Sequence, residues 1–97
     1  MAKVKKAARG KHRWIGFRYL EGTISRISCE QLFSTLLSEY SWKLFDLKVV
    51  DEVPTGILKI PLEQYKDTLL VINSESSLET LTSSGKIRLV RHRLGLE

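Results

Sequence analysis

Lysine and arginine side chains gather toward the two ends of this sequence. Residues 1–18 hold seven basic side chains and no acid, residues 19–85 hold five against ten acids, and residues 86–97 hold four against one. Such cations neutralise phosphates and release counterions, and arginine also forks onto phosphate oxygens. Two basic ends on an acidic body predict binding to a polyanion such as RNA, the alternatives being a solubility tail and a solvated helix face. The candidate contacts beside ordered elements are Lys11, Arg13, Arg18, Lys86, Arg88, Arg91 and Arg93.

Aromatic and apolar side chains of the first ordered segment are the second set of candidates. Trp14 and Leu20 could form part of an apolar surface for a partner protein. Trp14 could instead stack on an RNA base, but the glycine-containing string typical of RNA-recognition sheets is missing. Phe17 and Tyr19 are expected in the core, as aromatic residues on a first strand usually are.

Residues for protein catalysis do not occur in a recognisable arrangement. The sequence contains no catalytic motif, and Asp51 and Glu52 are adjacent residues whose side chains point apart at a hairpin tip. His12 and His92 are far apart in sequence, so no metal-ligand spacing is present, and the single cysteine, Cys29, cannot form an internal disulfide. We therefore expect no active site and no cofactor.

The length of 97 residues is that of one domain. Residues 1–12 lack periodicity and large apolar side chains, so we expect a mobile basic arm there, followed by one RNA-binding domain over residues 13–95. No apolar run is long enough to cross a membrane, and the basic start lacks the apolar region of a secretory signal. These features favour a cytoplasmic protein.

The elements that would position these residues begin with a strand over residues 14–20. A helix is expected from Ser28, where Ser28 and Gln31 form the pattern of a capping box. Next comes a strand over 44–50 in which Phe45, Leu47 and Val49 share a face.

A third strand is expected over residues 55–60, after a turn formed by residues 51–55. Pro54 and Pro61 bracket this strand, and Pro61 also begins a helix that continues to Ile72. Residues 73–85 and 86–94 are ambiguous, because the latter segment fits a strand or a helix equally well. Counting a last strand after residue 73, the order of elements predicts an α+β, ferredoxin-like sandwich: a four-stranded antiparallel sheet with helices packed on one face.

Three segments resemble one known family. They are KHRWIGFRYL at residues 11–20, TGILKIP at 55–61 before a helix containing Tyr65, and SSGKIRLVRHRLG at 83–95. In this order they are similar to the archaeal and eukaryotic ribonuclease P protein component two family. The chain departs from the family in being short, with a tight connection from Asn73 to Ser76 and little sequence after Leu94, which puts contacts made by longer members' extensions in doubt.

The resemblance implies a ferredoxin-like fold with a last strand over residues 77–82 and a C-terminal helix over 86–93. It implies a non-catalytic subunit of the endoribonuclease ribonuclease P, in which RNA catalyses removal of 5′ leaders from precursor tRNA. The partners implied are the ribonuclease P RNA and the barrel-fold protein component three, and a dimer of heterodimers is among the assemblies it allows. The alternatives are a stand-alone module for single-stranded RNA and a ferredoxin-like protein-interaction domain.

Overall fold

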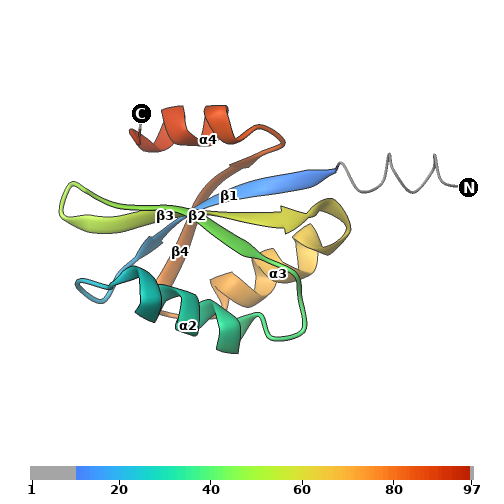
Figure 1. Ribbon diagram of the computed structural model, residues 1–97, viewed down its shortest axis with the longest axis horizontal. Coiled ribbons are helices and arrows are strands. Elements are labelled where there is room, and N and C mark those ends of the chain that lie inside the picture. The colour runs from blue at the N-terminus through green and yellow to red at the C-terminus, as the bar shows by residue number, and fades with distance from the viewer. Residues whose placement is uncertain (1–10, 97) are drawn as a thin grey trace, which may run out of the picture.

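A computed structural model describes residues 11–96, and the sheet is its central layer. The strands are β1 (His12–Tyr19), β2 (Lys43–Val50), β3 (Val53–Pro61) and β4 (Leu78–Ser84). Their order across the sheet is β2-β3-β1-β4, and every neighbouring pair is antiparallel (Figure 1). The α+β class and the four-stranded antiparallel sheet were predicted correctly. The expected arm falls outside the described residues except for its last two, and His12 already belongs to β1.

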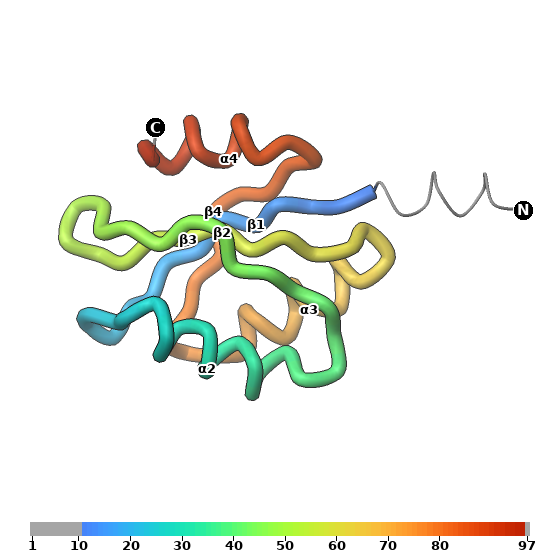
Figure 2. Tube along the Cα trace, in the orientation of Figure 1, coloured from blue at the N-terminus to red at the C-terminus, as the bar shows by residue number. Residues whose placement is uncertain are grey.

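Helices lie on both sides of the sheet. The α2 helix (Arg26–Leu36) and α3 (Tyr65–Asn73), which follows the 3-10 turn η1 (Leu62–Gln64), cover one face, whereas α4 (Ile87–Leu94) covers the other (Figures 1 and 2). The expectation that the helices share one face is therefore correct for α2 and α3 and wrong for α4. No helix in residues 11–96 is long and apolar enough to span a membrane.

The larger core fills the space between the sheet and the helices α2 and α3. Ile15 and Phe17 of β1 point into it, together with Leu58 and Ile60 of β3, and all four are fully buried. The ring of Phe17 meets that of Phe33 on α2 edge-on, with centroids 5.0 Å apart. Burial of such side chains is the main stabilising term for a domain of this size.

A smaller apolar cluster explains why α4 lies on the opposite face. Val90 and Leu94 recur at helical spacing and pack with Ile57 of β3, and Leu96 closes the cluster after the helix. Gly16 permits this approach, because a Cβ atom there would lie only 2.7 Å from Leu94 Cδ1. The sheet is thus buried on both faces along part of its length.

The N-cap of α2 lies three residues earlier than the sequence pattern suggests. Ser25 is the N-cap, with extended backbone, and its Oγ accepts a hydrogen bond from Ser28 N at 3.1 Å. The predicted cap at Ser28 is wrong, because Ser28 occupies the third helical position and uses its backbone N–H to satisfy the true cap.

The β2 strand contains a bulge that changes which side chains share a face. Leu44 pairs with Leu58 and Asp46 pairs with Ile57, so Phe45 is an extra residue without a partner in the β3 ladder. Leu44 and Leu47 consequently face α2 and α3, whereas Phe45 packs against Trp14 on the α4 side. The predicted common face therefore holds for Leu47 and Val49, which lie beyond the bulge, and is wrong for Phe45.

The β2–β3 hairpin turns in two residues, Asp51 and Glu52, both with positive φ (51° and 68°). Val50 and Val53 are the closing pair, so β3 begins at Val53 and not at residue 55 as predicted. Pro54 lies inside the strand opposite Val49. Its missing N–H costs no hydrogen bond to β2, because a residue next to a hydrogen-bonded closing pair directs its N–H away from the partner strand. On its other side, β3 begins to pair with β1 only at Thr55.

The C-terminal elements agree with the expectations from the family resemblance. β4 spans Leu78–Ser84, close to the expected 77–82, and α4 spans Ile87–Leu94, close to the expected 86–93. Segment 86–94 is thus a helix, not a strand.

Candidate nucleic-acid interface

The α4 helix begins directly after the last strand and carries the C-terminal basic cluster. The Oγ of Ser84 accepts a hydrogen bond from the backbone N–H of Lys86, which fixes the turn, and Gly95 ends the helix in a left-handed conformation (φ 74°). Arg91, His92 and Arg93 lie in the last turn, where cations interact favourably with the helix dipole. Since Ile87, Val90 and Leu94 pack toward the sheet, the remaining side chains are directed outward or sideways.

Lys86 and Arg88 are the most available of the predicted RNA contacts. Both are exposed, and with Leu89 and His92 they line a depression of about 330 Å³ on the outer side of α4. Neither makes a salt bridge within the described part of the chain. A phosphate reaching this surface would therefore not have to displace an internal carboxylate.

Arg91 and Arg93, in contrast, bind the sheet. Arg91 donates from Nε to Asp46 Oδ2 at 2.7 Å and from Nη2 to Asp46 Oδ1 at 3.2 Å, a two-pronged ion pair that joins α4 to β2. Arg93 Nη1 donates to Thr82 Oγ1 at 2.9 Å and to the Ser83 carbonyl at 3.2 Å. These two arginines primarily position the helix.

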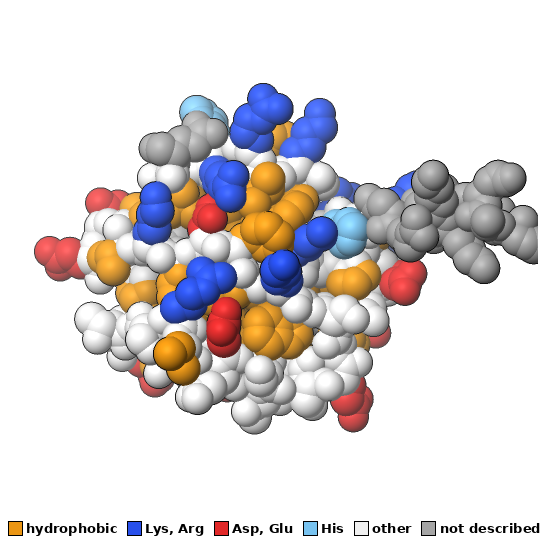
Figure 3. Space-filling model, in the orientation of Figure 1, with side chains coloured by type: hydrophobic (Ala, Val, Ile, Leu, Met, Phe, Trp, Pro, Cys, Tyr) orange, Lys and Arg blue, Asp and Glu red, His pale blue; other side chains and the backbone are white. Residues whose placement is uncertain are grey.

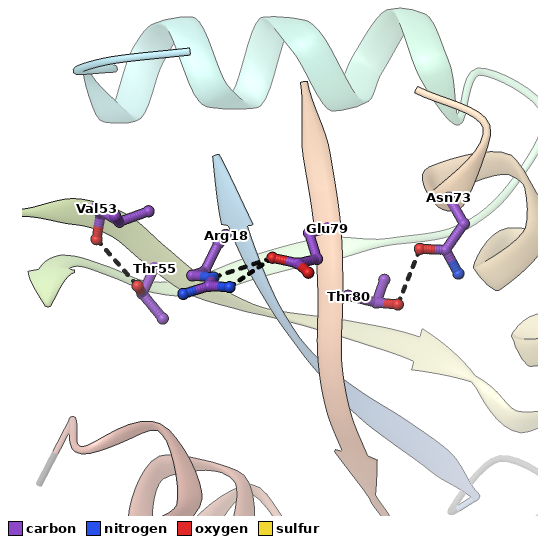
Figure 4. Close-up of polar contacts among 6 residues, drawn as sticks. All are labelled: Arg18, Val53, Thr55, Asn73, Glu79 and Thr80. Carbon is purple, nitrogen blue, oxygen red and sulfur yellow. Dashed lines mark hydrogen bonds and ion pairs between the residues drawn. The ribbon is translucent and has the colours of Figure 1, made fainter. Parts of the chain in front are cut away.

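Arg18 is engaged in the same way on the sheet. Its Nη2 and Nε atoms donate to Glu79 Oε1 at 2.6 and 3.2 Å, across the β1–β4 ladder (Figure 4). Nearby, Thr55 binds the Val53 carbonyl and Thr80 binds Asn73, so the polar groups drawn in Figure 4 are held by internal partners.

Lys11 and Arg13 lie at the start of β1, and the Arg13 guanidinium reaches Gly85 in the turn that leads into α4. The Arg13 guanidinium lies 5.8 Å from the centroid of the Tyr65 ring, on the α3 side of the sheet. Lys11 is exposed, and its carbonyl accepts a hydrogen bond from Leu62 N at 3.2 Å. The structure therefore does not bring all seven predicted contacts onto one surface.

Trp14 and Leu20, the predicted partner contacts, do not form one patch. Trp14 is half-buried near the start of β1 and packs edge-on against Phe45, with centroids 4.8 Å apart. Leu20 follows the other end of the strand and is 49% exposed. Phe17 is buried and Tyr19 half-buried in the larger core, as expected.

Two lysines that sequence analysis missed lie on the α4 side of the sheet. Lys43 of β2 and Lys59 of β3 are direct cross-strand partners, and Lys59 is in turn the partner of Trp14. Lys43 Nζ lies 5.6 Å from the Phe45 ring centroid, and Lys59 Nζ lies 5.5 Å from that of Trp14. We call Lys43, Lys59, Trp14 and Phe45 the basic aromatic row.

Groups with other chemistry are either buried or scattered. Burial raises the pKa of the Cys29 thiol from 9.0 to about 11, so this thiol is protonated at neutral pH. Residues 11–96 contain no cluster of three or more His, Cys, Asp or Glu side chains that could hold a metal ion. The arrangement is therefore best described as a set of cations around one helix and one row of the sheet.

Comparison of the chain with protein-family models, with curated proteins and with solved structures gave no match.

Proposed function

We propose that this chain is a non-catalytic, RNA-binding subunit of ribonuclease P that supports the catalytic RNA in removing 5′ leaders from precursor tRNA. The observation that carries the proposal is the position of the three segments that resemble component two of that enzyme. They occupy β1, most of β3 and the β4–α4 turn with α4 itself. These elements are neighbours, since β1 lies between β3 and β4 and α4 packs across them.

The assignment of the fold as a ferredoxin-like sandwich is also part of the proposal. An element order of strand, helix, two strands, helix and strand, with the sheet order β2-β3-β1-β4, is the plan of a ferredoxin-like sandwich. The α4 helix is then an addition that covers the second face. Because α4 packs on the central strand β1, part of this face of the sheet is covered. This counts against the alternative function, a stand-alone module that binds single-stranded RNA across its whole sheet.

The distribution of charge supports an RNA partner on the α4 side. Within the helices, α4 carries Arg88, Arg91 and Arg93 without an acid, whereas α2, η1 and α3 together carry three acids against two cations. Figure 3 shows Lys and Arg side chains gathered over α4 and the adjoining part of the sheet, with most Asp and Glu side chains below or at the margins. RNA would approach with its phosphates toward α4.

The remaining parts of the proposal follow from the family resemblance. The protein partner would be the barrel-fold component three, in the cytoplasm, with the exposed Leu20 among the contacts. The RNA would catalyse the cleavage, and the chain would help to position the RNA.

Reconstitution tests the proposal directly. The full chain, its partner subunits and the ribonuclease P RNA are combined, and cleavage of precursor tRNA is compared with the same mixture lacking the chain. We expect cleavage to rise when the chain is present and to fall when Arg88→Glu replaces it, with Lys66→Glu on the opposite face as the matched control. Cleavage that is equal with and without the chain overturns the assignment.

A further inference from the structure

One cross-strand row of the sheet brings aromatic rings and lysines together beside α4. Lys43, Lys59 and Trp14 are successive partners on β2, β3 and β1, and Ser84 continues the row on β4. Neighbouring strands are about 4.8 Å apart, so the three residues span roughly 10 Å. The α4 helix packs mainly against β1, β4 and β3, and Trp14 packs against its apolar cluster, so the row runs from the helix out to the β2 edge of the sheet.

The two lysines are held by the rings, not by carboxylates. Each ammonium lies within 6 Å of an aromatic centroid, Lys59 over Trp14 and Lys43 over Phe45. The rings meet edge-on at 82°, so they support each other and keep the lysines in defined positions.

The charge of the row lacks an internal counterpart. Like charges directly opposite each other on neighbouring strands are unfavourable, and Lys43 and Lys59 are such a pair. Neither forms a salt bridge in residues 11–96, and the carboxylate of Asp46 on the same strand is bound by Arg91. An anion bound between the two ammonium groups would remove their mutual repulsion.

We infer that the basic aromatic row binds an unpaired segment of RNA. Phosphates draw the ammonium groups of Lys43 and Lys59 away from the rings, and a base occupies the ring face that Lys59 leaves on Trp14. Cations along a backbone path together with an aromatic stacking surface are the combination that single-stranded nucleic acid requires. Bases within a duplex are stacked on their neighbours, so only an unpaired segment can place a base on the Trp14 ring.

This inference deepens the proposed function, on which it rests only for the identity of the RNA. Lys86 follows two residues after Ser84, so the row leads to the start of α4. A strand bound along the row would therefore continue toward Lys86 and Arg88, the exposed cations of the helix.

Trp14 fluorescence provides the test. In the full chain carrying Trp42→Phe, Trp14 is the single tryptophan, and a 20-nucleotide oligouridylate serves as the probe. We expect saturable quenching of its emission. Lys43→Gln with Lys59→Gln should weaken binding at least about fivefold and lower the log–log salt slope by about 0.7 per lost contact. Lys66→Gln on α3 is the matched control and should leave both quantities unchanged.

Two outcomes contradict the inference. Trp14 emission that stays constant while filter binding shows saturation would mean that RNA binds elsewhere, and equal affinities for the double variant and the Lys66→Gln control would exclude the lysines. Melting temperatures of all variants verify that they are folded. Quenching without any stimulation of precursor tRNA cleavage overturns the proposed function and leaves the row intact, whereas stimulation without quenching overturns the row alone.

Discussion

The basic side chains of α4 differ in what they touch. Arg88 is exposed and has no carboxylate partner among residues 11–96, whereas Arg91 forms a two-pronged ion pair with Asp46, whose side chain is only 19% exposed. An arginine bound to a half-buried carboxylate stabilises the fold more than a fully solvated one does. Substitution of Arg91 should therefore affect stability, whereas substitution of Arg88 should affect RNA binding.

Arg91→Gln should lower the free energy of unfolding by about 1 kcal/mol, because it leaves the Asp46 carboxylate without its two-pronged partner. This corresponds to a fall in melting temperature of roughly 5 °C. Arg88→Gln should leave the melting temperature unchanged and weaken RNA binding instead. Thermal denaturation and filter binding on the same two variants check the distinction, and it fails if both variants have the same melting temperature.

The Cys29 thiol should respond to pH through its burial. Its pKa is raised to about 11 in the folded chain, so folded Cys29 stays protonated between about pH 9 and 11 while the thiol of the unfolded chain ionises. The unfolded state binds fewer protons in this window, so the free energy of unfolding falls as pH rises through it and is unaffected by Cys29 below it. Denaturant titrations between pH 8 and 11 measure this fall, and Cys29→Ala should remove the part due to the thiol.

Some of the candidate residues could be predicted from sequence and others could not, for a geometric reason. The cations of α4 are visible as a local run of charge. Lys43 and Lys59, in contrast, are far apart in sequence. If the β2–β3 ladder continued without a bulge from the Asp51–Glu52 turn, the cross-strand partner of Lys43 would be Ile60. The bulge at Phe45 moves that partner to Lys59. Only the folded ladder reveals this row.

At the scale of elements, periodicity located most of the strands and helices but not their details. β1 and α3 were found because their apolar side chains recur at regular spacing. The first turn of α2 was missed because Ser28 and Gln31 match the pattern of a capping box, whereas the actual cap, Ser25, is set by its extended backbone conformation. The position of α4 on the second face was missed because Gly16 and Ile57 reveal a receiving surface only when β1 and β3 lie side by side.

Two glycines of the sheet should tolerate a methyl group to different extents. A Cβ at Gly56 would lie 2.5 Å from the Asp46 carbonyl oxygen and 2.7 Å from the buried ring of Phe17, and neither can move without disturbing the sheet. Gly56→Ala should therefore lower the free energy of unfolding by about 1–3 kcal/mol. Gly16→Ala should cost less, because the nearest atom is the end of the flexible Leu94 side chain. Denaturant unfolding of both variants checks the order, and a larger loss for Gly16→Ala would contradict it.

For the whole molecule, the two sides of the sheet differ in their balance of charge. The helices on one side display Glu30, Glu63 and Asp67 against Arg26 and Lys66, whereas the other side displays the arginines of α4 and the two lysines of the row. Such a difference orients the protein before contact, because RNA is attracted more strongly to the α4 side. The sequence revealed the excess of positive charge after residue 85, and the fold places the arginines of α4 on one side of the sheet.

The salt dependence of RNA binding should report this orientation. Neutralising Lys86 and Arg88 together should reduce the log–log slope by about 1.4, since each phosphate contact contributes about 0.7 with a single strand. Neutralising Arg26 and Lys66 on the other side should leave the slope unchanged. Affinities measured at several salt concentrations decide between these outcomes, and a flat response to salt in the unmodified chain would favour a protein-interaction domain.

The bulge at Phe45 has a consequence for how copies of the chain meet. β2 is an edge strand, and a straight edge offers its free backbone groups as a template for the strand of another molecule. The extra residue interrupts that template, and Lys43 and Lys48 place positive charge on either side of it. The same irregularity that aligns Lys43 with Lys59 thus guards the chain against edge-to-edge aggregation, so a protein partner at this edge must bind through side chains.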